Sequence, residues 1–316
     1  MKTFVLFIKL IRLTRLKKSF FYTSLTRQYT YFCINYKLSQ LPDYYMDKFE
    51  VIQPSALLAP YVRQYWFLRM ENVVQGMQRF VPNGCIMLTF HKNKYLQNNQ
   101  LSASCLSGQA TTYTNLIYSG TVDFISIVFQ PAGAMAFFSM PMSELNKQNI
   151  NIELLHDPLI LELEQRLSET DQNKTCVELI EQFLLRHMVR LEEYKIKRVI
   201  ASLEAIHSGE NDILQLAQTA CLGYKQFKRL FTECIGTTPK EYIRINRFQK
   251  ASYMLQTRSQ AGLTPLAETC GYYDKSHLIK EMKEFSGYTP KEYLSVCSPY
   301  SDYHVLFRSA FLDIKP

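Results

Sequence analysis

The sequence predicts an α+β protein in which a β-rich domain precedes an all-helical domain, and three observations predict this. Aromatic and β-branched residues gather in short blocks from Val62 to about Phe138, as they do in strands. From about Ser143 onward, apolar residues recur at helical spacing. Near the C-terminal end, the octapeptide GTTPKEYI at 236–243 returns as GYTPKEYL at 287–294, which indicates a duplicated helical unit.

The composition allows about two domains. The chain has 316 residues, of which 47% are hydrophobic and 20% charged, so each half is long enough to bury a core of its own. The formal net charge is +8, but residues 1–45 alone contribute seven of these charges, with Asp43 as their single acid. Because the rest of the chain is nearly neutral, net charge alone does not argue for nucleic-acid binding.

The cysteines do not form a recognisable site. Eight are present, and they show neither a C-x-x-C spacing nor a paired Cys/His cluster. We therefore expect no metal, no other cofactor and no disulfide scaffold, and a reducing cytoplasm as the compartment. No run of about 18 apolar residues occurs, so no membrane span is expected.

The basic segment 1–45 has three interpretations. A signal peptide disagrees with Lys9 and Arg12, which interrupt the apolar stretch, and no small-residue cleavage site follows. A basic amphipathic segment at a membrane surface is the second interpretation. The favoured third is an extension that is disordered or precedes the true start, because Met46 opens a stretch that looks like a natural beginning.

Residues 46–150 are predicted to form a compact β-rich domain with a barrel or cupin-like arrangement, which senses a signal or dimerises. Its strand-like segments are separated by breaks at 82–84 and 131–133. A metal-dependent barrel enzyme needs two or three histidines, and His91 is the only histidine in this range. No G-x-S-x-G motif and no Gly-rich phosphate loop appears. We therefore expect a binding or dimerisation domain and no enzyme.

Residues 151–193 are predicted to form a helical linker region. Val177, Ile180, Phe183 and Leu184 lie at helical spacing and make an apolar stripe. Such a stripe suits a domain junction or a dimer partner, and packing against the neighbouring β-rich domain explains it equally well.

Residues 194–297 are the most informative part of the chain. An amphipathic helix from 194 ends at Ser208-Gly209, and a short helix with Ala217 facing inward follows. After a turn at 221–223, another helix runs to Gly236. Two helices that cross at a small residue after a tight turn are typical of a helix-turn-helix unit.

The second helix of this unit is predicted to bury one face and expose the other. The buried stripe consists of Phe227, Leu230 and Phe231. The opposite face carries Tyr224, Lys225, Lys228, Arg229 and Thr232. Charge at this spacing is ordinary on any surface helix, so this face alone does not establish a function.

The repeat strengthens the interpretation as a DNA-binding surface. A short helix, a turn at Gly271 and a helix from Asp274 follow again, with one extra residue in the turn. The predicted buried residues are Leu278, Met282 and Phe285. The predicted outward residues are Lys275, Ser276, Ile279, Lys280 and Lys283, with His277 at the edge, where a structural role is common. Cations on two equivalent helices suit contacts with DNA phosphates and guanine edges.

The repeated octapeptide is predicted to cap helices. Thr238 precedes a proline and Glu241 lies three residues after it, the spacing of a capping box; Thr289 and Glu292 repeat this pattern. After the first copy, the chain runs without Gly or Pro to about Ser259. Such a helix would span ~30 Å, close to the ~34 Å between successive major-groove faces of B-DNA. One chain could therefore place two recognition helices in adjacent grooves.

The stretches ILQLAQTACLGYKQFKRLFTECIGTTPKEYIRINRFQKA and LAETCGYYDKSHLIKEMKEFSGYTPKEYL resemble the AraC/XylS family of bacterial transcription regulators over 194–297. The resemblance implies an all-helical domain of two subdomains that binds double-stranded promoter DNA. Its implied base contacts are Lys225, Lys228, Arg229, Lys275, Ser276, His277 and Lys280. RNA polymerase, a small-molecule effector and a second copy of the chain are open as further partners. The operator and the sign of regulation stay open as well.

The chain departs from the family pattern at four positions. Gly223 stands where the family usually has a capping serine. Leu278 and Met282 replace the usual aromatic residues, and Lys280 replaces an arginine that could make a bidentate contact with guanine. The segments LAPYVRQYWFL, RFVPNGCIMLTF and IVFQPAGAMAFF resemble the N-terminal domain of many such regulators from Bacteroidetes-like bacteria, which implies no particular ligand. The tail 298–316 lies beyond the resemblance.

Two other classes of protein fit the sequence less well. A bifunctional DNA-repair protein could use the same module as a targeting arm, but the cysteine methyl-acceptor domain of such proteins needs clustered zinc ligands, and none precede residue 190. A structural helical adaptor would not need cationic outward faces at matched positions on both copies.

Overall fold

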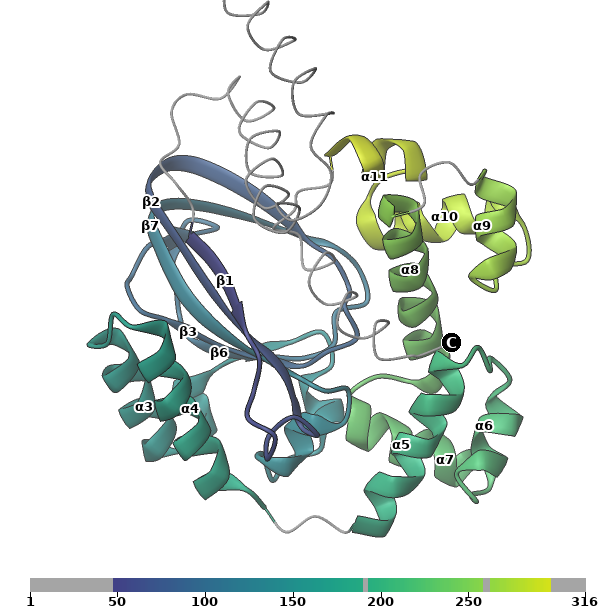
Figure 1. Cartoon of the computed structure of the whole chain (residues 1–316), viewed down its shortest axis with the longest axis horizontal. Coiled ribbons are helices and arrows are strands. Elements are labelled where there is room, and N and C mark those ends of the chain that lie inside the picture. The colour runs from purple at the N-terminus through teal and green to yellow at the C-terminus, as the bar shows by residue number, and fades with distance from the viewer. Residues whose placement is uncertain (1–47, 190–192, 258–261, 297–316) are drawn as a thin grey trace, which may run out of the picture. The chain divides into compact units, whose positions relative to one another are not determined.

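The structure is a computed structural model that describes residues 48–189, 193–257 and 262–296 (Figure 1). All of these belong to one compact unit, 45–316. The predictions for 1–45 and for 298–316 therefore lie outside the described residues. The predicted α+β fold is confirmed, since the long strands occur in the first part of the chain and the α-helices follow them.

The first part of the chain forms one antiparallel sheet. Its strands are β1 (Lys48–Ile52), β2 (Val62–Phe80), β3 (Met87–His91), β4 (Leu96–Gln97), β5 (Gln100–Leu101), β6 (Cys105–Ser107), β7 (Thr114–Phe129) and β8 (Asn149–Asn151). The order is β1-β2-β7-β3-β6-β8, with the small hairpin β4-β5 attached to β7. Among the described strands the short edges β1 and β8 do not pair, so this is an open sheet and not a closed barrel.

The two faces of the sheet have different neighbours because successive side chains of a strand point to opposite sides. On one face, Phe67 of β2 and its cross-strand partner Ile125 of β7 lie in the main apolar core. This core also holds residues of α3 (Pro158–Ser168) and α4 (Asn173–His187). On the other face, the paired residues Trp66 and Ser126 line a cavity.

The apolar stripe of the predicted linker region belongs to α4 and packs on the sheet. Ile180, Phe183 and Leu184 are buried in the core that contains the strand residues, and Val177 packs against it. Of the alternatives for this stripe, the structure therefore supports packing against the preceding β-rich domain. Two short 3₁₀ helices, η1 (Gly133–Ala136) and η2 (Met142–Leu145), lie between β7 and β8, and a third, η3 (Ile152–Leu155), joins β8 to α3.

The second part of the chain is helical (Figure 1). Its helices are α5 (Glu193–His207), α6 (Ile213–Thr219), α7 (Tyr224–Ile235), α8 (Pro239–Thr257), α9 (Leu263–Thr269), α10 (Lys275–Ser286) and α11 (Pro290–Val296). We call α6–α7 with α5 the first unit, and α9–α10 with α11 the second unit. None of the described helices is long and apolar enough to cross a membrane.

Helix α8 contributes to the cores of both units. Its residues Tyr242 and Ile243 lie in the core of the first unit, together with Phe227 and Phe231. The later residues of α8, including Ile245 and Phe248, lie in the core of the second unit, together with Leu278, Met282 and Phe285. A single continuous helix therefore fixes the two units to each other.

Candidate nucleic-acid interface

Helix α7 carries the first set of predicted DNA contacts on an exposed face. Tyr224, Lys225, Lys228 and Arg229 are all exposed. On the opposite side of the helix, Phe227 and Phe231 are fully buried, with ring centroids 5.6 Å apart. The predicted buried stripe is confirmed at these two residues, while Leu230 is only partly buried.

The cations of α7 are only weakly engaged within the protein. Arg229 Nε lies 3.8 Å from Glu233 Oε1, and 77% of the Arg229 side chain is exposed. Lys228 Nζ lies 5.9 Å from the ring centroid of Tyr224. Exposed contacts of this kind contribute little to stability, so phosphate or base groups could replace them at small cost. The half-buried Thr232 differs, because its hydroxyl donates to the carbonyl oxygen of Lys228 at 2.7 Å.

Helix α10 carries the second set on a comparable face. Lys275, Ser276, Lys280 and Lys283 are exposed. Three residues on the inner side are fully buried, as predicted: Leu278, Met282 and Phe285. The helix begins firmly, since the carboxylate of Asp274 accepts a 2.7 Å hydrogen bond from the backbone N–H of His277. At the start of α7, Gly223 provides no such side-chain cap.

The ring of His277 is used by contacts within the second unit. Its Nδ1 accepts a hydrogen bond of 3.3 Å from the backbone N–H of Tyr273, so a neutral ring carries its proton on Nε2. That Nε2 lies 3.4 Å from Glu281 Oε1, and the ring packs edge-on against Tyr272. These contacts give His277 a structural role, whatever else it does.

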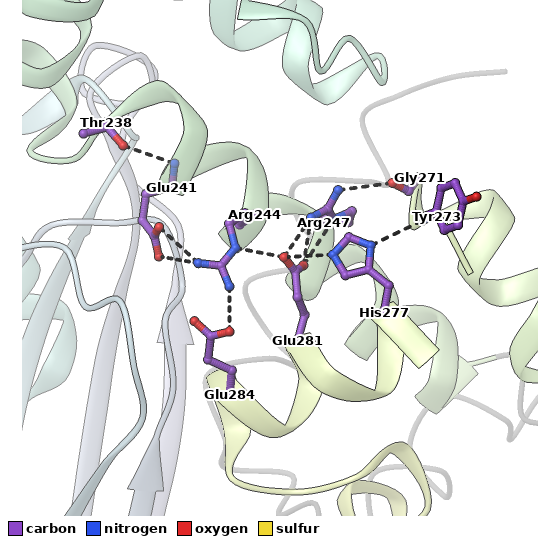
Figure 2. Close-up of polar contacts among 9 residues, drawn as sticks. All are labelled: Thr238, Glu241, Arg244, Arg247, Gly271, Tyr273, His277, Glu281 and Glu284. Carbon is purple, nitrogen blue, oxygen red and sulfur yellow. Dashed lines mark hydrogen bonds and ion pairs between the residues drawn. The ribbon is translucent and has the colours of Figure 1, made fainter. Parts of the chain in front are cut away.

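A buried carboxylate that the sequence analysis did not single out connects α8 to α10 (Figure 2). The side chain of Glu281 is 5% exposed. Its Oε1 accepts hydrogen bonds of 2.8 Å from Arg244 Nε and 2.9 Å from Arg247 Nη2. Arg247 also donates to the carbonyl oxygen of Gly271, in the turn before α10, at 3.2 Å. The two arginines of α8 therefore hold both α10 and its preceding turn.

The Arg244 guanidinium has three carboxylate neighbours (Figure 2). Besides Glu281, it lies 2.8 Å from Glu284 and 3.3 Å from Glu241. Burial lowers the pKa of Arg244, but hydrogen bonds to Glu284 and Glu281 outweigh this effect and leave the pKa raised. Arg244 is thus held in its charged form. The sequence gives one sign of this network: Arg244 and Arg247 are three residues apart, and so are Glu281 and Glu284.

The two predicted capping boxes differ in geometry. In the second, the backbone N–H of Thr289 donates to Glu292 Oε2 at 2.8 Å, and the Glu292 N–H donates to Thr289 Oγ1 at 3.4 Å. Hydrogen bonds from the backbone and the hydroxyl of Thr289 lower the pKa of Glu292. In the first, the Glu241 N–H donates to Thr238 Oγ1 at 3.3 Å, but the Glu241 carboxylate contacts Arg244. The Arg244 guanidinium competes for this carboxylate.

Two family models match the chain. Residues 216–295 match a helix-turn-helix domain, and residues 50–151 match a domain of unknown function (DUF6597). The first match covers both α7 and α10. The second covers nearly the whole sheet.

The relatives found by sequence are transcription regulators. An uncharacterized HTH-type transcriptional regulator of Haemophilus influenzae is 30% identical over 122 residues, which are 35% of this chain and 41% of that protein. The HTH-type transcriptional regulator GbdR of Pseudomonas aeruginosa is 26% identical over 108 residues, 34% of this chain and 29% of that protein. The chain thus covers less than half the length of these relatives.

Among solved structures, ToxT from Vibrio cholerae is similar over 73% of this chain and 97% of its own, with 12% identity and a TM-score of 0.38. The family and sequence matches confirm the resemblance stated above. The chain carries a C-terminal helix-turn-helix domain of the AraC type, preceded by a domain that has no assigned role.

Proposed function

We propose that this chain is a sequence-specific transcription regulator that binds double-stranded promoter DNA through α7 and α10. The observation that carries the proposal is the pair of exposed cationic faces, each on a helix whose opposite side is buried in a core. Such helices can neutralise phosphates and reach base edges in the major groove. The relatives are named as regulators, which does not favour the alternative of a bifunctional repair protein.

The linker helix supports simultaneous binding by both units. Helix α8 has 19 residues, and at 1.5 Å per residue this gives a length of about 28 Å. Successive major-groove faces of B-DNA are about 34 Å apart. Because α8 is built into both cores, we propose that α7 and α10 enter adjacent grooves as one rigid pair.

We assign the base contacts by position on the two helices. Lys225, Lys228 and Arg229 read bases in the first half-site, and Lys275, Ser276 and Lys280 read bases in the second. Tyr224 and Lys283 contact the sugar-phosphate backbone. Thr232 and His277 act mainly by holding their helices in place, since both side chains already have partners within the protein.

The remaining features complete the proposal. The sheet domain binds an effector or a second copy of the chain, the protein works in the cytoplasm, and it catalyses no reaction. RhaS of Escherichia coli, 24% identical over 143 residues, is named a transcriptional activator. We propose activation here too, with RNA polymerase as a partner on the promoter.

The test begins by mapping genome-wide binding of the tagged chain to identify operators. On such an operator, Lys228→Ala and Arg229→Ala should each weaken binding by about 1–3 kcal/mol in a mobility-shift assay. Arg229→Ala should also relax specificity at one base pair, because it removes a bidentate donor. Lys174→Ala and Arg186→Ala, which remove cations that are also exposed but lie on α4, are the matched controls. Equal affinities for all four variants would refute the assignment of α7.

A further inference from the structure

The face of the sheet opposite to α3 and α4 encloses a cavity of about 300 Å³. This volume lies at the small end of the range of ligand pockets. Apolar side chains line one part of it, among them Trp66, Leu68 and Phe124, and hydroxyl groups line another, among them Thr89, Ser107 and Ser126. The cavity therefore suits a small molecule that has an apolar body and a few polar groups.

The lining residues favour an uncharged occupant. They include no Asp or Glu, and their single Lys or Arg is Lys147, which is itself exposed. The remaining basic group, His91, is buried, and burial is the main reason why its pKa is lowered to about 4. Its Nδ1 lies 3.0 Å from the hydroxyl of Tyr95. An ammonium group would find no opposite charge in this lining, and a carboxylate would find only the exposed Lys147.

Among the buried polar side-chain atoms of the described lining residues, the indole nitrogen of Trp66 has no partner. Trp66 is 4% exposed, and its indole Nε1 makes no hydrogen bond within the part of the chain that the structure describes. A buried N–H without an acceptor is costly and uncommon in native structures. This nitrogen also has almost no accessible surface, so a carbonyl or ether oxygen on an occupant of the cavity reaches it only when the Trp66 ring shifts.

The end of β2 joins this cavity to the second helix-turn-helix unit. Phe80 and Val81 line the cavity, and Val81 is also buried in the core around Phe248 and Phe285. Directly after Val81, the carbonyl oxygen of Pro82 accepts a hydrogen bond from the side chain of Gln249 on α8. A shift of this strand end would therefore change both the cavity lining and the core of the second unit.

Arg79 makes a second connection, which we call the Arg79 clamp. Its guanidinium lies between the rings of Tyr113 and Tyr288, 4.4 Å and 4.3 Å from their centroids. Its Nη1 donates to the carbonyl oxygen of Ser286, the last residue of α10, at 3.1 Å. Tyr113 stands between Thr112 and Thr114 in the chain, and both threonines line the cavity. The clamp thus holds the end of a recognition helix against a wall of the cavity.

We propose that the cavity binds an uncharged small molecule with an oxygen acceptor for Trp66, and that the Arg79 clamp couples its occupancy to the position of α10. The coupling to DNA affinity rests on the function proposed above. The coupling requires two arrangements of the clamp that differ in DNA affinity. A ligand shifts the balance between them only as far as it binds one arrangement more tightly than the other.

The binding test uses three molecules of nearly the same shape: cyclohexanecarboxamide, cyclohexanecarboxylate and cyclohexylmethylammonium. Trp66 is the only tryptophan of the chain, so a change in tryptophan emission reports on the cavity directly. Saturable changes with the neutral amide, and tenfold weaker or absent changes with both ions, are expected for the full chain. No saturation with the amide at millimolar concentration, or tighter binding of either ion, would overturn the ligand class.

The coupling test measures amide hydrogen exchange in residues 283–289 with and without cyclohexanecarboxamide, and needs no DNA. Cyclohexanecarboxamide should change the hydrogen-exchange rates of these residues several-fold in the wild type and leave them unchanged in Arg79→Ala. Both proteins should bind cyclohexanecarboxamide equally. Arg69→Ala, on the same strand with an exposed ion pair to Glu71, is the control that keeps the response. Arg79→Lys serves if the alanine variant does not fold, since lysine keeps the charge without the planar stacking.

Two results would overturn the coupling: binding of the amide to wild type without a change at 283–289, or an undiminished change in the Arg79 variants. The same proteins are then assayed on an operator, where the amide should shift wild-type affinity and leave Arg79→Ala affinity constant. A chain that shows the exchange response but binds no operator would refute the proposed function and leave the clamp in place.

Discussion

The two helix-turn-helix units have the same sequence motif but are held in place by different forces. The first unit relies on apolar packing around Phe227 and Phe231, and its helix α7 begins at an uncapped glycine. The second adds a buried carboxylate with two arginines and a capping aspartate. Ion pairs have strict geometry, whereas apolar packing tolerates small shifts. The comparison suggests that the orientation of α10 is more tightly specified than that of α7.

The largest expected difference between the units comes from two glutamates whose ion pairs differ in burial, Glu281 on α10 and Glu233 on α7. Glu281→Ala leaves two arginines without their carboxylate in a buried site and should lower the free energy of unfolding by about 3–5 kcal/mol. Glu233→Ala removes only an exposed partner of Arg229 and should cost about 0–1 kcal/mol. Urea denaturation followed by circular dichroism measures both. Equal losses of unfolding free energy would show that the buried ion pairs do not stabilise the second unit more than the exposed pair stabilises the first.

Substitutions of the glycines that end α7 and α10 should come next in size. Gly236 and Gly287 have φ angles of 88° and 75°, so Gly236→Ala and Gly287→Ala should each lower stability by about 1–2 kcal/mol. The loss should be larger at Gly236. An added Cβ there would lie 2.9 Å from the backbone oxygen of Met142, whereas at Gly287 the close atoms all belong to side chains, those of Arg79 and Tyr113. Thermal unfolding gives the order, and a smaller loss at Gly236 would contradict it.

The capping threonines offer a finer test. Thr289→Ala removes a reciprocal box and should cost about 1 kcal/mol, whereas Thr238→Ala removes one long hydrogen bond and should cost about half of that. The pKa of Glu292 is lowered in the folded state, so its contribution is present above the unfolded pKa. It is lost as the pH falls through the folded value. Denaturation of both variants at neutral and acidic pH checks this, and a Thr289→Ala effect that is as large in acid as at neutral pH would speak against it.

The smallest expected effect is a gain in stability. Gly223 has φ −69° and ψ 151°, the extended conformation of a helix N-cap, so serine fits there without strain. Gly223→Ser should stabilise the first unit by a few tenths of a kcal/mol and bring the start of α7 closer to that of α10. Hydrogen exchange at the first turn of α7 would detect the change, and a destabilised variant would show that the cap position is needed for something other than stability.

The parts of the structure that follow from local periodicity could be predicted. The buried faces of α7 and α10, the continuity of α8 and the α+β order all result from spacing within one element. The role of Glu281 could not be predicted this way, because its partners lie 34 and 37 residues away and Glu281 itself looks like any charged surface residue. The open edges of the sheet and the position of Arg79 between two rings likewise depend on distant pairings. The assignment of individual side chains to DNA bases stays a prediction.

The sharing of α8 between two cores has a consequence for how the domain can be divided. The sequence repeat has its boundary at the octapeptide, but the folded boundary does not lie there, because Tyr242 and Ile243 complete the first core and Phe248 completes the second. A fragment cut between the copies would leave an apolar stripe of α8 in water. We expect the two units to unfold in a single cooperative transition. The duplicated sequence therefore forms one folding unit that cannot be divided at the repeat boundary.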